Sequence, residues 1–336
     1  STPRQGHGCK KLPLPGRSAY DYGMENSTIR IYDTSLRDGL RNSGIAIGLD
    51  DKVRFLQQLE ALGVSDVEVG FGGPSQVETM ERLAEAVEQP VLYGLSRVNR
   101  RDVDRVITSL ARANHRGINI FSPTSEEFLG HGKTTAGEAL EASVKAIRHA
   151  RDQLGDPMGD QIGDGAGKVV FSAQDATKSE LAYLIEIIAA VIEAGADVIS
   201  LADTRSLAMP REFGDLCAAL RAKVPGGQDV LWSVHCHNGL GLAVANCAAG
   251  IENGVRQVEC TVNGIGEIGS NTTGSNTTMQ AVVELLQRRA DAFPGLNTAI
   301  KYGVIPDTEH MLRDISQRTD EASSGTIELL QRDAPK

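Results

Sequence analysis

The feature that most constrains the fold of this 336-residue chain is a repeat, in which a short β-branched or aliphatic run precedes an amphipathic segment. The repeat occurs eight times between residues 28 and 293. Alternating strands and helices imply parallel strands with right-handed crossovers, and eight units in about 250 residues match a closed (β/α)8 barrel, or TIM barrel. A doubly wound open sheet is the alternative. The predicted strands are 28–33, 64–71, 90–96, 117–122, 168–173, 197–202, 229–234 and 257–262.

Each predicted strand is followed by apolar residues at helical spacing. The first of these segments predicts a helix over 50–63. Asp50 is its expected N-cap, because Asp accepts bonds from free helix N–H groups, and Gly63 is its expected C-cap. The other predicted helices lie near 75–88, 100–113, 136–154, 177–194, 210–223, 240–253 and 275–293.

These elements divide the chain into three parts. Residues 1–27 form an N-terminal tail, 28–293 form the barrel, and 294–336 form a short C-terminal extension. Within the extension, a helix is expected near 306–318.

Charge and composition exclude several classes of partner. The 44 Asp and Glu residues outnumber the 34 Lys and Arg residues, for a net charge of -10. Nucleic acids and anionic membranes attract clustered positive charge, so neither is an expected partner. No apolar run has the length of a membrane span or the form of a signal peptide. The five cysteines lack Cys-x-x-Cys spacing, which favours a reducing cytoplasm over a disulfide framework.

Two histidines near the end of the seventh predicted strand are candidates for metal ligands. His235 and His237 stand at i and i+2 in an extended segment, so both imidazoles point to the same side of the strand. A buried, hydrogen-bonded pair without an ion is the alternative interpretation. A barrel favours the metal site, because it collects the C-terminal ends of all strands at one face. Asp38, next to Arg37, follows the first predicted strand and is expected at the same face.

Three strings carry a resemblance to a known family. DTSLRDG, HCHNGLGLAVAN and NGIGEIGSN, in this order over about 28–293, resemble the DRE-TIM metallolyase superfamily, which includes isopropylmalate, homocitrate and citramalate synthases and 3-hydroxy-3-methylglutaryl-CoA lyase. The resemblance implies that Asp38, His235 and His237 bind a divalent metal ion, with Asn271 as a fourth ligand. The ion is expected to be Mg, Mn, Co or Zn, because such ligands suit all four.

The resemblance also implies how the site acts. Two imidazoles and a carboxylate leave positions open for a chelating 2-oxo acid, whose ketone the ion polarises. Arg37 is expected to stabilise the developing oxyanion, and Glu68 to take part in catalysis. The alternative for Glu68 is a structural role in an ion pair. The alternative for Thr204 is to cap a turn. The residues expected to contact substrate are Arg37, Arg97, Asn119, Ser172 and Thr204.

The direction of the reaction depends on the loop after the eighth strand. Lyases of the superfamily place a catalytic Cys there, whereas residues 263–271 contain none, which favours the synthase branch. The expected reaction joins an acyl-CoA, usually acetyl-CoA, to a 2-oxo acid, giving a 2-alkylmalate- or homocitrate-like hydroxy acid and free CoA. Leu40 and Asn42 instead match the lyases, and Gln174 stands where synthases often have Glu.

Other readings remain open. A metal-dependent lyase or aldolase is the main alternative, and a catalytically silent barrel that binds a partner is another. The catalytic base is unassigned; His131 and His310 are candidates, although surface positions explain both. Gly264, Gly266 and Gly269 spell a dinucleotide fingerprint but follow the last unit instead of opening the first, so NAD is not expected. Family barrels pair through their helices, so a homodimer is expected.

Overall fold

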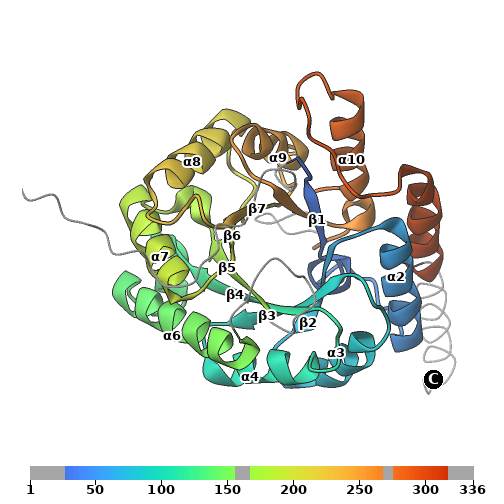
Figure 1. The fold of residues 1–336 in the computed structure, drawn as a ribbon, viewed down its shortest axis with the longest axis horizontal. Helices are drawn as coiled ribbons and strands as arrows, with labels where there is room; N and C mark the ends of the chain where they lie inside the picture. Colours follow the sequence, from blue (N-terminus) through green and yellow to red (C-terminus); the bar gives the residue numbers. More distant parts are fainter. Residues whose placement is uncertain (1–26, 156–166, 268–274, 317–336) are drawn as a thin grey trace, which may run out of the picture.

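The computed structural model describes residues 27–155, 167–267 and 275–316. Within these ranges eight parallel strands pair in sequence order and close into a barrel, surrounded by helices (Figure 1). The predicted TIM barrel is therefore confirmed. The strands are β1 (Arg30–Asp33), β2 (Asp66–Phe71), β3 (Val91–Arg97), β4 (Arg116–Pro123), β5 (Lys168–Gln174), β6 (Val198–Asp203), β7 (Leu231–Cys236) and β8 (Gln257–Cys260).

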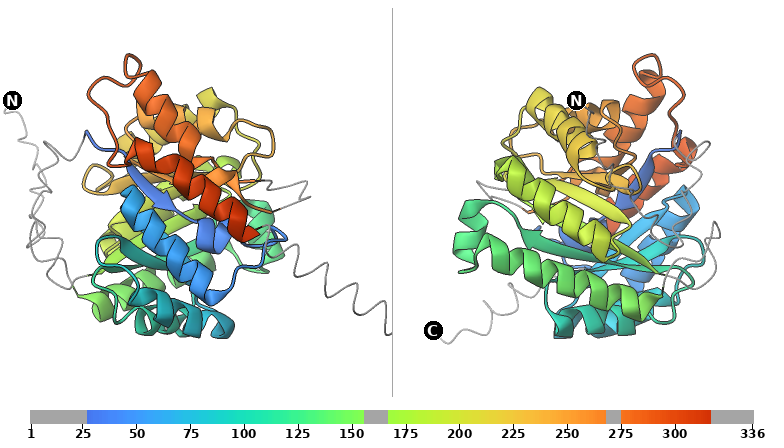
Figure 2. Two further views of the ribbon diagram at one scale, coloured as in Figure 1. Left: turned by 90° about the vertical axis from the view of Figure 1, so that its right-hand side faces the viewer. Right: turned by 60° about the vertical axis from the view of Figure 1, so that its left-hand side comes forward.

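A layer of helices covers the outside of the barrel. A short helix, α5 (Glu126–His131), precedes α6, and a last helix runs over 305–316. This last helix lies beside α2 (Figure 2), and Gln58 Nε2 of α2 donates to Thr308 Oγ1 at 3.0 Å. The helices that follow the eight strands are α2 (Leu49–Leu62), α3 (Val77–Ala84), α4 (Arg100–Ser109), α6 (Ala136–Leu154), α7 (Leu181–Ala194), α8 (Pro210–Lys223), α9 (Ala243–Glu252) and α10 (Met279–Arg288).

The start of α2 differs from its prediction. The helix begins at Leu49 with Gly48 at the N-cap, so the assignment of Asp50 as N-cap was wrong. Asp50 lies in the first turn instead, where a negative charge interacts favourably with the helix dipole. Gly63 ends the helix in the left-handed conformation, at φ 93°, as predicted. A Cβ at Gly63 would lie 2.7 Å from the carbonyl oxygen of Ala299, so only glycine fits there.

The barrel interior changes from apolar to polar along the strands. Tyr32, Tyr93, Val170 and Val198 form a buried cluster apart from the larger core between strands and helices. The Tyr32 and Tyr93 ring centroids lie 5.0 Å apart. Closer to the C-terminal ends, strands β2 and β4–β8 carry buried polar side chains that bond to one another, namely Glu68, Asn119, Ser172, Ser200, His235 and Glu259. The floor of the mouth is therefore polar and buried.

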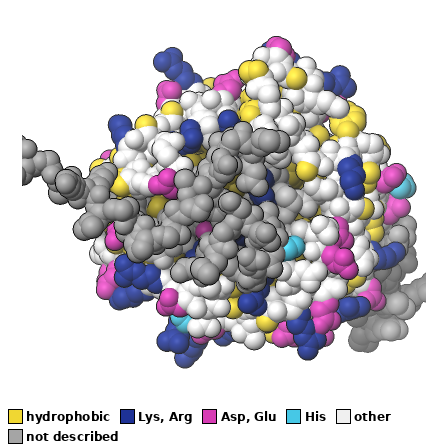
Figure 3. Space-filling model, in the orientation of Figure 1, with side chains coloured by type: hydrophobic (Ala, Val, Ile, Leu, Met, Phe, Trp, Pro, Cys, Tyr) yellow, Lys and Arg dark blue, Asp and Glu magenta, His cyan; other side chains and the backbone are white. Residues whose placement is uncertain are grey.

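One face of the molecule (Figure 3) carries charges of both signs. On the face seen in Figure 3, basic and acidic side chains are interspersed around the rim. Among the helices of the described ranges, none has both the length and the apolar character that crossing a membrane requires.

A buried arginine holds together the N-terminal side of the barrel. Arg151, near the end of α6, is 8% exposed. Its guanidinium donates to the carbonyl oxygens of Gly155 and Gly167, each at 3.0 Å, and of Gly195 at 2.9 Å. It also pairs with Asp197. One side chain thus joins the end of α6, the start of β5 and the turn before β6.

Arg151→Met is expected to lower the free energy of unfolding by about 3 kcal/mol, because it removes a buried guanidinium that three carbonyl oxygens and the Asp197 carboxylate share as a donor. Denaturant unfolding followed by circular dichroism measures the change. The control is Arg112→Met, whose side chain is 79% exposed in its pair with Glu85 and whose loss should therefore change stability little. Equal losses in the two variants would contradict the role assigned to Arg151.

Candidate active site

Three predicted ligands converge at the mouth of the barrel. Asp38 comes from the π-helical turn η1 (Ser35–Gly39), which follows β1, while His235 lies at the end of β7 and His237 directly after it. The Nε2 atom of His237 lies 3.2 Å from Asp38 Oδ2 and 3.3 Å from His235 Nε2. His235 Nε2 lies 3.7 Å from the same Asp38 oxygen. These three residues offer ligand atoms that all lie within 4.8 Å of one another.

The opposite ring nitrogens fix the orientation of both histidines. His235 Nδ1 lies 3.0 Å from Glu259 Oε2, and His237 Nδ1 lies 3.0 Å from the carbonyl oxygen of Thr204. A carboxylate and a carbonyl can only accept, so each Nδ1 carries the proton and donates it. Each Nε2 then presents its lone pair to the shared point near Asp38. Two neutral imidazoles and a carboxylate are a donor set that fits a divalent ion such as Zn, Co or Mn, and also Mg.

Electrostatics keep the third ligand charged. Burial disfavours ionisation of Asp38, but the adjacent Arg37 guanidinium holds the pKa of that carboxyl well below its usual value. Burial also disfavours the charged form of His235, and its bond to Glu259 outweighs this and raises its pKa.

Glu259 is a site residue that the sequence reasoning missed. It is 2% exposed on β8, and its Oε1 accepts bonds from Ser200 and, at 3.1 Å, from Ser233. Burial opposes its charge, but the bond from His235 lowers its pKa below the ordinary value. Its signal in the sequence was an acid within the predicted strand 257–262, between the apolar Val258 and Cys260.

Arg37 is held between two carboxylates. It pairs with Asp38 through Nη1 and with Glu68 through Nε. Glu68 is fully buried and also accepts from Asn119 Nδ2 at 3.2 Å and from Tyr32 at 3.4 Å. Burial raises the pKa of Glu68, against the opposing effect of Arg37. These contacts hold the Glu68 carboxylate against the Arg37 guanidinium.

The residues predicted to contact substrate differ in their hydrogen-bond partners and in their exposure. Asn119 is 1% exposed and accepts from Ser172 Oγ at 2.7 Å, so its amide bonds on both sides to internal partners. Thr204 Oγ1 accepts the backbone N–H of Asp175 at 3.0 Å, a contact that braces two neighbouring loops. The Arg97 side chain is 56% exposed, pairs with Asp102 at 2.6 Å and lies over the Phe71 ring.

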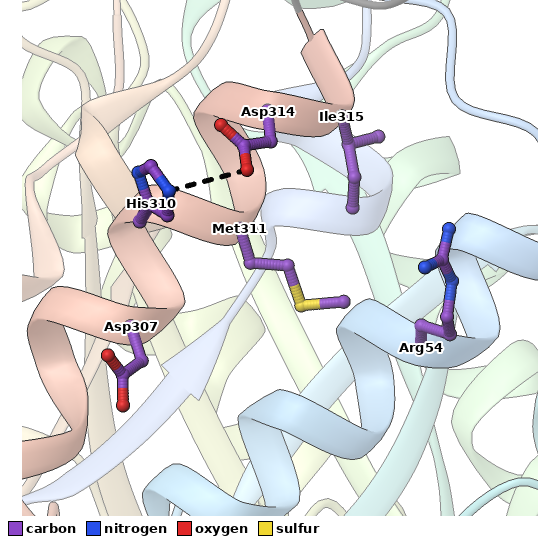
Figure 4. Close-up of a pocket in the computed structure, with 6 residues that line it drawn as sticks. All are labelled: Arg54, Asp307, His310, Met311, Asp314 and Ile315. Atoms are coloured by element: carbon purple, nitrogen blue, oxygen red, sulfur yellow. Dashed lines mark ion pairs between the residues drawn. The ribbon is translucent and has the colours of Figure 1, made fainter.

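The remaining candidates lie away from this cluster or outside the described residues. Asn271 falls outside the described residues. His131 is exposed at the end of α5. His310 lies in a surface cavity of about 230 Å³ between α2 and the 305–316 helix, 3.4 Å from Asp314 (Figure 4). The cavity belongs to the outer helical layer, so its position gives no support to His310 as the catalytic base.

A second buried acid shapes the turn that carries Arg37 and Asp38. Asp33, at the end of β1, accepts the backbone N–H and the hydroxyl of Ser35, both at 2.9 Å. The Ser35 hydroxyl in turn accepts the backbone N–H of Val262 at 2.8 Å. The DTS string therefore ties the start of η1 both to β1 and to the loop after β8. Burial raises the pKa of Asp33 to about 7.

Comparisons with known proteins agree with this geometry. Residues 28–312 match the HMGL-like family model. The 2-isopropylmalate synthase of Syntrophus aciditrophicus is 38% identical over 291 residues, which cover 86% of this chain and 53% of that protein. The enzyme of the same name from Neisseria meningitidis serogroup B is 38% identical over 279 residues, covering 82% and 50%. The chain thus spans about half the length of these relatives.

Solved structures share the fold at lower identity. The HMG-CoA lyase of Bacillus subtilis has a TM-score of 0.69 at 19% identity, covering 86% of this chain and 93% of that one. The HMG-CoA lyase of Brucella melitensis has a TM-score of 0.69 at 18% identity, covering 87% and 99%. At these identities, the match shows a common barrel.

The raised pKa of Asp33 predicts a pH-dependent stability. An unfolded Asp ionises near its ordinary value of 3.8, whereas the folded protein holds this proton up to a pH of about 7. The stabilisation is complete below the unfolded pKa and is lost as the pH rises toward 7, by about 1 kcal/mol per pH unit. Asp33→Asn does not titrate, so its stability relative to the parent protein should rise between pH 5 and 7.

Urea unfolding at several pH values measures this difference. Asp229→Asn is the control, because its side chain is exposed in the folded protein and should give no such trend. A constant difference between Asp33→Asn and the parent protein across this range would contradict the prediction.

Proposed function

Because this chain belongs to the HMGL-like family, we propose that it condenses an acyl-CoA, with acetyl-CoA as the expected donor, with a 2-oxo acid. The products are a 2-alkylmalate- or homocitrate-like hydroxy acid and free CoA. The observation that carries the proposal is the convergence of Asp38, His235 and His237 at the mouth of the barrel. Similarity to 2-isopropylmalate synthases at 38% identity favours the condensing direction.

We propose a divalent ion, Mg, Mn, Co or Zn, at these three ligands, with Asn271 as a fourth. When bound, the ion supplies Lewis acidity toward the keto oxygen of the substrate. The protein contributes fixed lone pairs, because Glu259 and the Thr204 carbonyl hold both imidazoles with Nε2 toward the ion.

Arg37 is the proposed catalytic cation. Negative charge develops on the keto oxygen as the new carbon–carbon bond forms, and a guanidinium held in place stabilises it without reorganisation. Its bonds to Glu68 and Asp38 fix that position before substrate arrives. Glu68 therefore acts through Arg37 in this proposal.

The substrate contacts remain proposals of the same kind. Thr204 has its hydroxyl proton available for the substrate carboxylate while its oxygen accepts from Asp175. Ser172 and Asn119 form the floor, and Arg97 lies at the rim. Condensation transfers a proton from the thioester methyl group to a base, joins that carbon to the keto carbon, and ends with hydrolysis of the thioester. The base is left unassigned.

The assembly and location are likewise proposed. We expect a homodimer in the cytoplasm, in line with a biosynthetic role. Light scattering after size-exclusion chromatography gives the mass of the assembly directly.

The reaction is tested by mixing the protein with acetyl-CoA and a panel of 2-oxo acids and following free CoA with a thiol reagent. We expect CoA release with a subset of the oxo acids, lost on treatment with a chelator and restored by added divalent ion. Release of a 2-oxo acid or an acyl-CoA from a hydroxy acid, without condensation, would instead establish the lyase reaction. Absence of both activities would overturn the proposal.

Arg37→Lys tests the proposed catalytic cation. We expect kcat to fall about 100-fold, because lysine cannot hold the Glu68 and Asp38 contacts together and loses the fixed donor geometry. Affinity for the divalent ion should change little, since the three ligands remain. The matched control is Arg100→Lys on α4, whose side chain is 79% exposed and whose kcat should equal that of the parent protein. A fall in kcat below threefold for Arg37→Lys would exclude this role.

A further inference from the structure

The two histidines of the metal cluster differ in what holds them. His237 donates its Nδ1 proton to a neutral backbone carbonyl, that of Thr204, at 3.0 Å. His235 donates to a carboxylate, Glu259, also at 3.0 Å. A backbone carbonyl is present whatever the side chain, whereas the acid behind His235 depends on the residue at one position.

The surroundings of Glu259 aim one of its oxygens at His235. Ser200 on β6 and Ser233 on β7 both donate to Oε1, which leaves Oε2 directed at the imidazole. All these groups are buried, with Glu259 2% exposed and both serines fully buried. A buried carboxylate without donors is costly, and here three donors from two neighbouring strands satisfy it.

This arrangement constrains His235 in two ways. With its proton held on Nδ1, the ring has one lone pair, at Nε2, which faces His237 and Asp38. The negative charge behind the ring makes Nε2 a stronger donor, as an acid hydrogen-bonded to a metal-binding imidazole generally does. Rotation of the ring would break the bond to Glu259 and leave the buried carboxylate without that donor.

We infer that Glu259 is a positioning residue for His235, which selects the ring tautomer and strengthens binding of the divalent ion. Ser200 and Ser233 orient the carboxylate for its hydrogen bond with His235. The inference rests on the proposed function only in requiring that Asp38, His235 and His237 bind the ion. It assigns Glu259 no contact with substrate.

The test uses the whole chain, freed of metal and titrated with Co²⁺ or Mn²⁺ in competition with a fluorescent chelator. Glu259→Gln preserves the size of the side chain and removes its charge. We expect the dissociation constant to rise 10- to 100-fold, the range found for such partners of metal-binding histidines. NMR of ¹⁵N-labelled imidazole should show His235 as the Nδ1–H tautomer in the metal-free parent protein and a mixture of tautomers in Glu259→Gln.

Glu68→Gln is the matched control, because it makes the same change at an equally buried carboxylate that contacts Arg37 instead of an imidazole. Its dissociation constant should stay within about threefold of the parent value, with the His235 tautomer unchanged. If Glu259→Gln does not fold, Ser233→Ala serves instead. It removes a single donor to Glu259 and should raise the dissociation constant for the divalent ion several-fold.

The outcomes separate the two proposals. A parent protein that binds no divalent ion overturns the metal site and the inference together. A parent protein that binds the ion while Glu259→Gln or, where that variant does not fold, Ser233→Ala binds it equally well overturns the inference alone. Equal weakening by Glu259→Gln and Glu68→Gln would also overturn it, because the effect would then be one of buried charge in general.

Discussion

Closure of the barrel is the constraint on which the rest of the structure depends. β1 pairs with β8, and β8 pairs with β7, so the ends of the first and seventh strands lie two strands apart at one mouth. Asp38 and His237, which lie 3.2 Å apart at their nearest side-chain atoms, are separated by 199 residues of chain. An open sheet would put β1 and β8 at different positions and leave the ligands apart. The pairing of β1 with β8 and of β8 with β7 therefore brings these ligands together, although they are far apart in the sequence.

Much of the fold and part of the site could be predicted from sequence because they depend on local periodicity. The period of two along a strand puts His235 and His237 on one side, and strand–helix alternation implies that Asp38 joins them. The helix ends were harder, because the start of α2 depends on the conformation of Gly48 and not on the nearby Asp50. Capping preferences say which residue types favour a cap position, but they do not decide at which of several neighbouring residues the helix begins.

The partners of the site residues could not be predicted, because they depend on distant pairs. Glu259 bonds to Ser200, 59 positions earlier, and Asn119 bonds to Ser172, 53 positions later. From the sequence alone, an isolated acid or amide within a strand is equally compatible with a structural hydrogen-bonded pair and with a functional group. The bonds of Asn119 to Glu68 and Ser172 could not be read from its residue type, because both partners lie on other strands.

The bonded side chains form two supports that reach the metal cluster from different strands. One runs from Ser172 through Asn119 and Glu68 to Arg37, which contacts Asp38. The other joins Ser200 and Ser233 through Glu259 to His235. Because all members are bonded and all but the partly exposed Arg37 are buried, displacing one leaves its neighbour unpaired, at a cost that favours a single arrangement. The position of His235 at the mouth is therefore decided partly by Ser200, Ser233 and Glu259, which bond to one another on the Nδ1 side of its ring.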